Sequence, residues 1–440
     1  MEKAFSRLSN ELFNKLKKEE YLILFFEGEN SQFIRFNRGS IRQTGLVDDS
    51  SLMMKYICDG KSCQGSYTIS GNFDLDLKRG SEELIRLREE AKSLPTDPFV
   101  VIPGNLGSTR EIKKTSGLEN KHTVDALLPA ISDLDFVGIW ASGKVFRGNS
   151  NNLGQRHWFE TDSFCLDYSL VTPEHQMVKG TFTGNDWDQN QYEAYIEGSR
   201  KKLEMMKRKP IKVDTGKYRT WFESAAVADL LGMFSWNGIS EASLQQGCSG
   251  FGRMRHQNIE LSDKFSIAED FTSGLSPKFN TNGEISNETL DLIDKGRLKN
   301  TLISTRSAKE YNLKSNFAET GEFMRSPIMA TGDLEREQIL KNLDTGLYLS
   351  NIHYLNWSDN PGGRITGLTR YACFWVEGGE IKAPIETMRF DDSFYNFFGD
   401  NLIDVENTAS INPEVSTYGG RSLSATTCPG ILVDNFTLTL

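Results

Sequence analysis

The stretch Trp221-Phe222-Glu223-Ser224-Ala225-Ala226-Val227-Ala228-Asp229-Leu230-Leu231-Gly232-Met233-Phe234 is the most informative segment of this 440-residue chain. Its apolar residues recur at three- and four-residue intervals, a spacing that gathers them on one face of an α-helix. The sequence therefore predicts a helix over 221–234 with one face buried in a core. The residues of that apolar stripe are Ala226, Val227, Leu230, Leu231 and Phe234.

The segments around this helix indicate a second half richer in strands and loops than in helices. Residues 370–389 alternate around Gly378-Gly379 as a β-hairpin does. Further helices are predicted over 287–295 and 335–343. Upstream, a charged helix over 189–209 ends at Pro210, because proline cannot continue it. We place the domain boundary there, which gives an N-terminal α+β domain over 1–210 and a C-terminal α+β domain over 211–440 with long loops and hairpins.

The N-terminal half mixes helical and extended patterns. An amphipathic helix opens it over residues 1–18, and a second helix begins at Ser81 and ends before Pro95. Neighbouring extended runs favour antiparallel pairing. The predicted class is α+β, with two domains whose mixed or largely antiparallel sheets are flanked by helices. The extended runs cover 21–27, 32–44, 51–70, 135–147 and 158–172.

The net charge and the short apolar runs of the sequence argue against nucleic acid and membranes as partners. Lys and Arg total 50 against 60 Asp and Glu, a net charge of −10 that works against binding to nucleic acid or to anionic membranes. The apolar runs are far shorter than the ~18 residues of a membrane span, and the N-terminus lacks the pattern of a secretory signal. We expect a cytoplasmic protein with six reduced cysteines and with neither nucleic acid nor membrane as partner.

Common catalytic motifs are missing from the sequence. It contains no phosphate loop and no Gly-x-Ser-x-Gly elbow. The five histidines lie far apart in sequence, so no helix can present two imidazoles to one metal. Cys428 could act as a nucleophile only if the fold brought a base such as His353 to it; burial as a small apolar residue is the alternative. The residues alone indicate a two-domain α+β protein without a recognisable catalytic centre.

Five stretches, taken in order from about residue 33 to the C-terminus, resemble the TldD/PmbA family. This family is known both under the label of modulators of DNA gyrase and as a peptidase system. The resemblance implies dimers of family chains that enclose a cavity for extended peptides. The stretches are Arg35-Phe36-Asn37-Arg38-Gly39-Ser40-Ile41-Arg42-Gln43, Gly216-Lys217-Tyr218 with the helix after it, 276–298, Leu343-Asp344-Thr345-Gly346-Leu347-Tyr348, and Gly363-Arg364-Ile365-Thr366-Gly367 with the hairpin 376–381.

The two branches of the family differ in their metal ligands. In the TldD branch a helix carries His-Glu-x-x-x-His, and a cysteine near the C-terminus completes a zinc site that activates water; the TldE (PmbA) branch lacks these ligands. Aligned on that motif, Phe222 and Val227 replace the two imidazoles and Ser416 stands near the third ligand position. The resemblance thus implies that this chain binds no metal and that zinc belongs to a partner subunit. Glu223 is the one catalytic candidate left in the helix.

The sequence therefore predicts a non-catalytic TldE/PmbA-like subunit of a cytosolic TldD/TldE-type zinc metallopeptidase complex that degrades or processes peptides. Its partner would be a TldD-like zinc subunit, or a second copy of itself. Two alternatives stay open. One is an autonomous hydrolase of altered mechanism that uses Cys428 or Glu223. The other is a homodimeric peptide-binding or scaffold protein without a proteolytic role, so whether the chain is an enzyme is undecided at this point.

Overall fold

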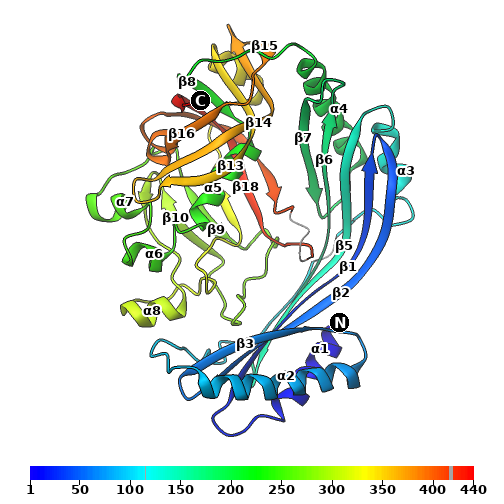
Figure 1. Cartoon of the computed structure of the whole chain (residues 1–440), viewed down its shortest axis with the longest axis vertical. Coiled ribbons are helices and arrows are strands. Elements are labelled where there is room, and N and C mark those ends of the chain that lie inside the picture. Colours follow the sequence, from blue (N-terminus) through cyan, green and yellow to red (C-terminus); the bar gives the residue numbers. More distant parts are fainter. Residues whose placement is uncertain (114, 416–419) are drawn as a thin grey trace.

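The structure, a computed structural model, describes residues 1–113, 115–415 and 420–440 and consists of two β-sheets with helices packed on them. In Figure 1 the two sheets lie side by side, and the long strands of the N-terminal sheet run down to the helices at the lower end. This confirms the predicted α+β class with two domains. Within the described residues, no helix is long and apolar enough to cross a lipid bilayer.

The N-terminal sheet has the strand order β3-β2-β1-β5-β6-β4, with β7 also paired to β6. All of these pairs are antiparallel except β4 with β6. Two apolar clusters cover it, one beneath α1 and α2 and the other beneath α3 and α4. The strands are β1 Tyr21–Asn37, β2 Ser40–Cys58, β3 Lys61–Thr68, β4 Thr109–Ile112, β5 Phe136–Asn151, β6 Arg156–Val171 and β7 Met177–Gly184.

Several boundaries predicted for this half are wrong. The breaks expected between residues 27 and 32 and between 44 and 51 do not occur, since β1 continues to Asn37 and β2 runs unbroken from Ser40 to Cys58. The chain turns instead at Arg38-Gly39, both with positive φ. A two-residue turn of this kind suits a tight hairpin, and glycine adopts its backbone at no cost. The second helix begins at Phe73, not Ser81, because the Asn72 side chain accepts a hydrogen bond from Leu75 N and caps it.

The C-terminal sheet has the order β11-β10-β9-β12-β18-β16-β14-β13-β8, with β15 on β14 and β17 on β18. Strand β8 pairs with both β13 and β18, which closes part of the sheet on itself around an apolar core. The helix predicted over 287–295 is strand β10. The strands are β8 Gly216–Phe222, β9 Ile267–Asp270, β10 Thr289–Asp294, β11 Arg297–Leu298, β12 Pro327–Met329, β13 Gly346–Asp359, β14 Arg364–Glu377, β15 Glu380–Pro384, β16 Arg389–Ser393, β17 Leu402–Pro413 and β18 Ala425–Leu438.

Helix α5 follows β8 and packs into the C-terminal core. Helix α4 lies at the interface between the domains, where its Leu203 and Met206 share an apolar cluster with Phe374 of β14. Helix α4 ends and β8 begins on either side of residue 210. The α-helices are α1 Glu2–Phe13, α2 Phe73–Ser93, α3 Thr123–Leu127, α4 Gln189–Met206, α5 Ser224–Ser235, α6 Glu241–Gln245, α7 Gly252–Gln257, α8 Thr305–Tyr311 and α9 Ile339–Leu343; short 3₁₀ turns cover Leu128–Ala130 and Arg336–Gln338, and a π-helical turn covers Asn396–Asp400.

A polar cluster joins the two domains at the loop 279–283. Lys55 donates to Asn282 Oδ1 at 2.9 Å, and Asn149 Nδ2 donates to Thr281 O at 2.9 Å. The ring of His157 stacks on Phe279 at 4.9 Å between centroids, and burial lowers the pKa of His157 to about 4, so the ring is neutral at physiological pH. These hydrogen bonds and the ring contact hold the long N-terminal strands against the C-terminal domain.

Candidate functional site

A cleft of about 680 Å³ lies where the two domains face each other beside helix α5. Strand β7 contributes one wall with Lys179 and Thr181, and the ends of β17 and β18 contribute another with Asn412 and Thr426. Strands β13 and β14 complete it with His353 and Tyr371. The size falls in the range of pockets that bind small molecules or short chain segments.

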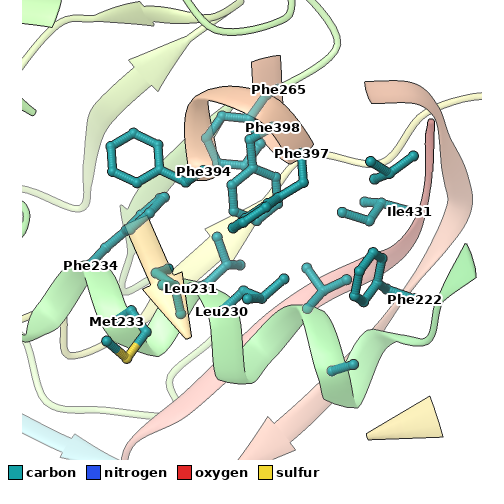
Figure 2. Close-up of a cluster of buried hydrophobic side chains, with 14 of the residues drawn as sticks. Phe222, Leu230, Leu231, Met233, Phe234, Phe265, Phe394, Phe397, Phe398 and Ile431 are labelled. Carbon is teal, nitrogen blue, oxygen red and sulfur yellow. The ribbon is translucent and has the colours of Figure 1, made fainter. Parts of the chain in front are cut away.

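Helix α5 has two chemically different faces. Figure 2 shows Phe222, Leu230, Leu231 and Phe234 in one apolar cluster with phenylalanines from the turn at 394–398. The opposite face lines the cleft, and its residues have small side chains except for one acid. Small side chains leave the cleft open beside the helix backbone. The cleft-lining residues of α5 are Ala225, Ala228, Asp229, Gly232 and Ser235.

The two positions predicted to replace imidazole ligands, one just before helix α5 and one within it, are both buried in the C-terminal core. Phe222 is the last residue of β8, since the helix begins at Ser224 and not at Trp221, and its ring meets Phe436 edge-on at 4.8 Å between centroids. Phe222 and Val227 are both 0% exposed. Side chains at these two positions therefore point away from the cleft. Ser416 lies outside the residues that the structure describes.

The carboxylate of Glu223, the catalytic candidate, accepts two hydrogen bonds. It accepts one from Lys202 Nζ of α4 and one from the Tyr348 hydroxyl. Burial, and then the Glu223 charge, raise the pKa of Tyr348 well above its usual range. The Lys202 contact crosses the domain interface, and Glu223 is not among the cleft-lining residues. Glu223 thus forms an ion pair that links the two domains.

Cys428, the other candidate, is a buried thiol in β18. It is 0% exposed, its Sγ donates to Ser224 O at 3.3 Å, and Asn412 Nδ2 lies 3.6 Å from the sulfur. Burial raises the pKa of Cys428 to about 12. Because the thiolate is the nucleophilic form of cysteine, this environment disfavours nucleophilic chemistry.

Asp229 is an acidic group that the motif search does not single out. It lies on the cleft face of α5, where loss of solvation between the cleft walls, and then the charge of Glu414, raise the pKa of Asp229 to about 7. The side chain is nevertheless exposed to the solvent of the open cleft. A signal in the sequence could have identified Asp229. It lies on the helix face opposite the apolar stripe, among the small residues Ala225, Ala228 and Gly232.

The other charged and polar groups of the cleft are mostly paired or neutral. Lys179 Nζ lies 2.5 Å from Asp167 Oδ2. Burial, and then the Arg370 charge, lower the pKa of His353 below its usual range. Tyr371 has a φ of 63° at an irregularity in the pairing of β13 with β14, a device that redirects side chains near binding sites. The cleft thus offers hydrogen-bonding groups along its walls and one carboxyl group that can gain or lose a proton near pH 7.

Because the pKa of Asp229 is raised in the folded chain, the free energy of unfolding should depend on pH through this residue. Because the folded-state value of about 7 exceeds the ordinary 3.8, the folded chain binds this proton more tightly than the unfolded chain, and stability falls as pH rises through that window. We expect Asp229→Asn to be more stable than wild type at about pH 8, by on the order of 1 kcal/mol since water screens the side chain, and to lose that advantage toward about pH 4.

Urea denaturation at several pH values measures this difference. Asp263→Asn is the matched control, because Asp263 is exposed and lies outside the cleft. The same pH profile for Asp229→Asn and wild type would contradict the assignment of the shifted carboxyl group to Asp229.

The residues of the described ranges do not fit a zinc site. No three side chains among their histidines, cysteines, aspartates and glutamates come together as metal ligands. Asp229 is the one side chain on the cleft face of α5 that could coordinate a metal ion, and its neighbours on that face are mostly alanine and glycine. A catalytic zinc needs three protein ligands and an open position.

The fold and the cleft define a two-domain α+β protein with a polar cleft between its domains. The family model of the PmbA/TldA metallopeptidase C-terminal domain matches residues 215–440, about half of the chain. The chain belongs to the TldD/PmbA family, as its sequence resemblance implied. The Metalloprotease PmbA homolog of Buchnera aphidicola is 30% identical to it over 128 residues, which cover 29% of this chain and 28% of that protein.

Solved structures share the fold over nearly the whole chain. A protein from Thermotoga maritima described as a putative modulator of a DNA gyrase aligns with a TM-score of 0.77 at 16% identity, covering 99% of this chain and 100% of the other. A second, from Bacteroides thetaiotaomicron, gives 0.79 at 14%, covering 99% and 98%. TldE from Thermococcus kodakarensis gives 0.73 at 15%, covering 99% and 100%. At these identities the likeness establishes the fold.

Proposed function

We propose that this chain is a non-catalytic, TldE-like subunit of a two-chain zinc peptidase, and that its cleft forms part of the chamber that receives an extended peptide. The observation that carries the proposal is the cleft face of α5. It lies in the domain matched by the metallopeptidase family, yet alanine, glycine and a single carboxyl group line it. In this proposal the zinc and the activated water belong to the partner chain.

The shape and chemistry of the cleft support a peptide as its ligand. Groups that donate or accept hydrogen bonds, such as Thr181, Asn351 and Asn412, come from three different walls. A peptide backbone offers one N–H and one C=O group per residue and needs partners for both when it leaves water. The small residues of α5 leave room for side chains of varied size.

An autonomous hydrolase has less support. Glu223 is held by Lys202 and Tyr348, and the Cys428 thiol is buried in the core. A nucleophile needs a base within hydrogen-bond reach and access to substrate, and neither residue lines the cleft. A peptide-binding or scaffold protein without a proteolytic partner remains the second candidate, since the cleft itself suits both functions.

Zinc content and co-purification separate these candidates. The purified chain alone is expected to hold well under about 0.1 zinc per chain, because three ligands are not gathered in the described cleft. Tagged and expressed in its native host, it is expected to co-purify with a family chain that carries His-Glu-x-x-x-His and zinc. One firmly held zinc in the isolated chain would contradict the non-catalytic assignment, and capture of no such partner would favour the scaffold function.

A further inference from the structure

Four side chains of the cleft lining favour contact with aromatic rings. Aromatic side chains attract other rings edge-on or offset, and the sulfur of methionine is also attracted to rings. We call these four residues the aromatic patch. They share the cleft with the small residues of α5. The patch consists of Phe323 and Met324, from the segment before β12, and His353 and Tyr371, from β13 and β14.

Phe323 presents an apolar ring to the cleft from a fixed position. The residue is 42% exposed. On one side of it, the Glu322 carboxylate accepts a hydrogen bond from Ser240 Oγ at 2.7 Å, and on the other, Met324 N donates to Ser235 Oγ at the end of α5, at 3.1 Å. Because both neighbours are held, the ring stays beside α5. Exposed apolar groups that gather in one place mark sites where a ligand covers them.

Tyr371 lines the cleft from a strained position in β14. Asn351 of β13 pairs with Arg370, and Leu349 pairs with Cys373, so two residues of β14 lie opposite one residue of β13 in a β-bulge. Tyr371 lies in this bulge with a φ of 63°. A residue other than glycine is costly in this left-handed region, and such strain persists mainly at sites that bind or react. The bulge places the tyrosine ring on the wall of the cleft.

A second irregularity of the same two strands extends the patch. The pairing of β13 with β14 shifts between His353 and Asn356, and Tyr354 in this stretch has a φ of 53° and is 74% exposed. Its ring centroid lies 4.2 Å from that of His353. Burial, and then the Arg370 charge, lower the pKa of His353, so its ring is neutral at physiological pH. A neutral ring can stack on an aromatic ligand without a charge that must stay hydrated.

We propose that the aromatic patch binds an aromatic side chain of the extended peptide, and that Phe323 and Tyr371 determine this selectivity. The ligand ring covers Phe323 and contacts Tyr371, which removes apolar surface from water and adds attraction between rings. This selectivity rests on the proposed function, because a peptide must first enter the cleft.

Peptide binding to the purified chain tests the selectivity. The probes are uncharged pentapeptides of alanine, blocked at both ends, with phenylalanine, leucine or alanine at the centre. Their dissociation constants are measured by calorimetry or NMR titration. We expect the phenylalanine probe to bind roughly tenfold or more tightly than the alanine probe, and the leucine probe to have an intermediate affinity.

Two substitutions test whether the patch is responsible. Phe323→Ala removes the exposed ring, and Tyr371→Gly removes the second ring while glycine adopts the φ of 63° without strain. We expect each to reduce the preference for phenylalanine over alanine to about threefold or less, with the affinity for the alanine probe unchanged. Trp236→Ala is the matched control, since Trp236 is an exposed aromatic residue outside the cleft lining and its loss should leave the preference intact.

The possible results separate the selectivity from the proposed function. Equal affinities for the phenylalanine and alanine probes, or for the phenylalanine and leucine probes, would overturn the aromatic selectivity and leave the cleft a peptide site. A preference that survives both Phe323→Ala and Tyr371→Gly would overturn the role of the patch. Binding of none of the probes would count against the selectivity and against peptide binding by the cleft.

Discussion

Histidine at both positions 222 and 227 is expected to lower the free energy of unfolding by about 5 kcal/mol, because each imidazole would enter a closed apolar core. Phe222 and Val227 are 0% exposed, and Phe222 contacts Phe436 edge-on. A loss of this size approaches the whole stability of many domains. The double variant Phe222→His, Val227→His should also fail to gain peptidase activity, since both side chains face away from the cleft.

Chemical denaturation measures the loss, and Ala225→His is the matched control. It places the same side chain on the cleft face of the same helix, where we expect a change below about 1 kcal/mol. If the double variant were as stable as the control, the assignment of these two positions to the core would be wrong. If it bound zinc and cleaved peptides by itself, the chain would be a decayed catalytic subunit.

Tryptophan at Gly232 is expected to lower partner-dependent peptide cleavage about tenfold or more without harming the fold. A Cβ at Gly232 would meet no atom within 4 Å, so the large ring can extend from α5 into the cleft. Replacing glycine inside a helix also removes a backbone entropy cost. The effect should therefore appear in turnover and not in stability.

Gly198→Trp controls for the substitution itself. Gly198 lies in α4 and is exposed, and a Cβ at this position would also meet no atom within 4 Å. It is not part of the cleft lining. Equal turnover for both variants in a mixture with the zinc-bearing chain would show that the cleft beside α5 takes no part in handling peptides.

Periodicity predicts the existence of α5 and its buried face but not its start. Trp221 and Phe222 extend the apolar pattern, yet they belong to β8, because Trp221 packs in a separate cluster with Leu334 and Leu432. Tertiary packing decides such boundaries. Likewise residues 289–294 form a strand near the sheet edge, although their pattern of leucine, isoleucine and aspartate also suits a helix.

The cleft itself could be predicted only in part. Its helix is visible in the sequence, but the apolar stripe and the aligned motif both point to the core face and away from Asp229. The remaining walls come from Lys179, His353 and Asn412, which are far apart in sequence. Contacts of that range depend on the topology of both sheets, and no local pattern in a single sequence reports them.

Peptide turnover in a mixture of two chains measures whether this chain acts as a non-catalytic subunit. The wild-type chain is combined with a family chain that carries His-Glu-x-x-x-His, and cleavage of an extended peptide is compared with that by each chain alone. We expect no cleavage by this chain alone and a rise in cleavage by the partner when the two are mixed. Turnover by this chain alone that a chelator does not stop, or no rise on mixing with a partner that binds it, would show that the chain is not a non-catalytic subunit.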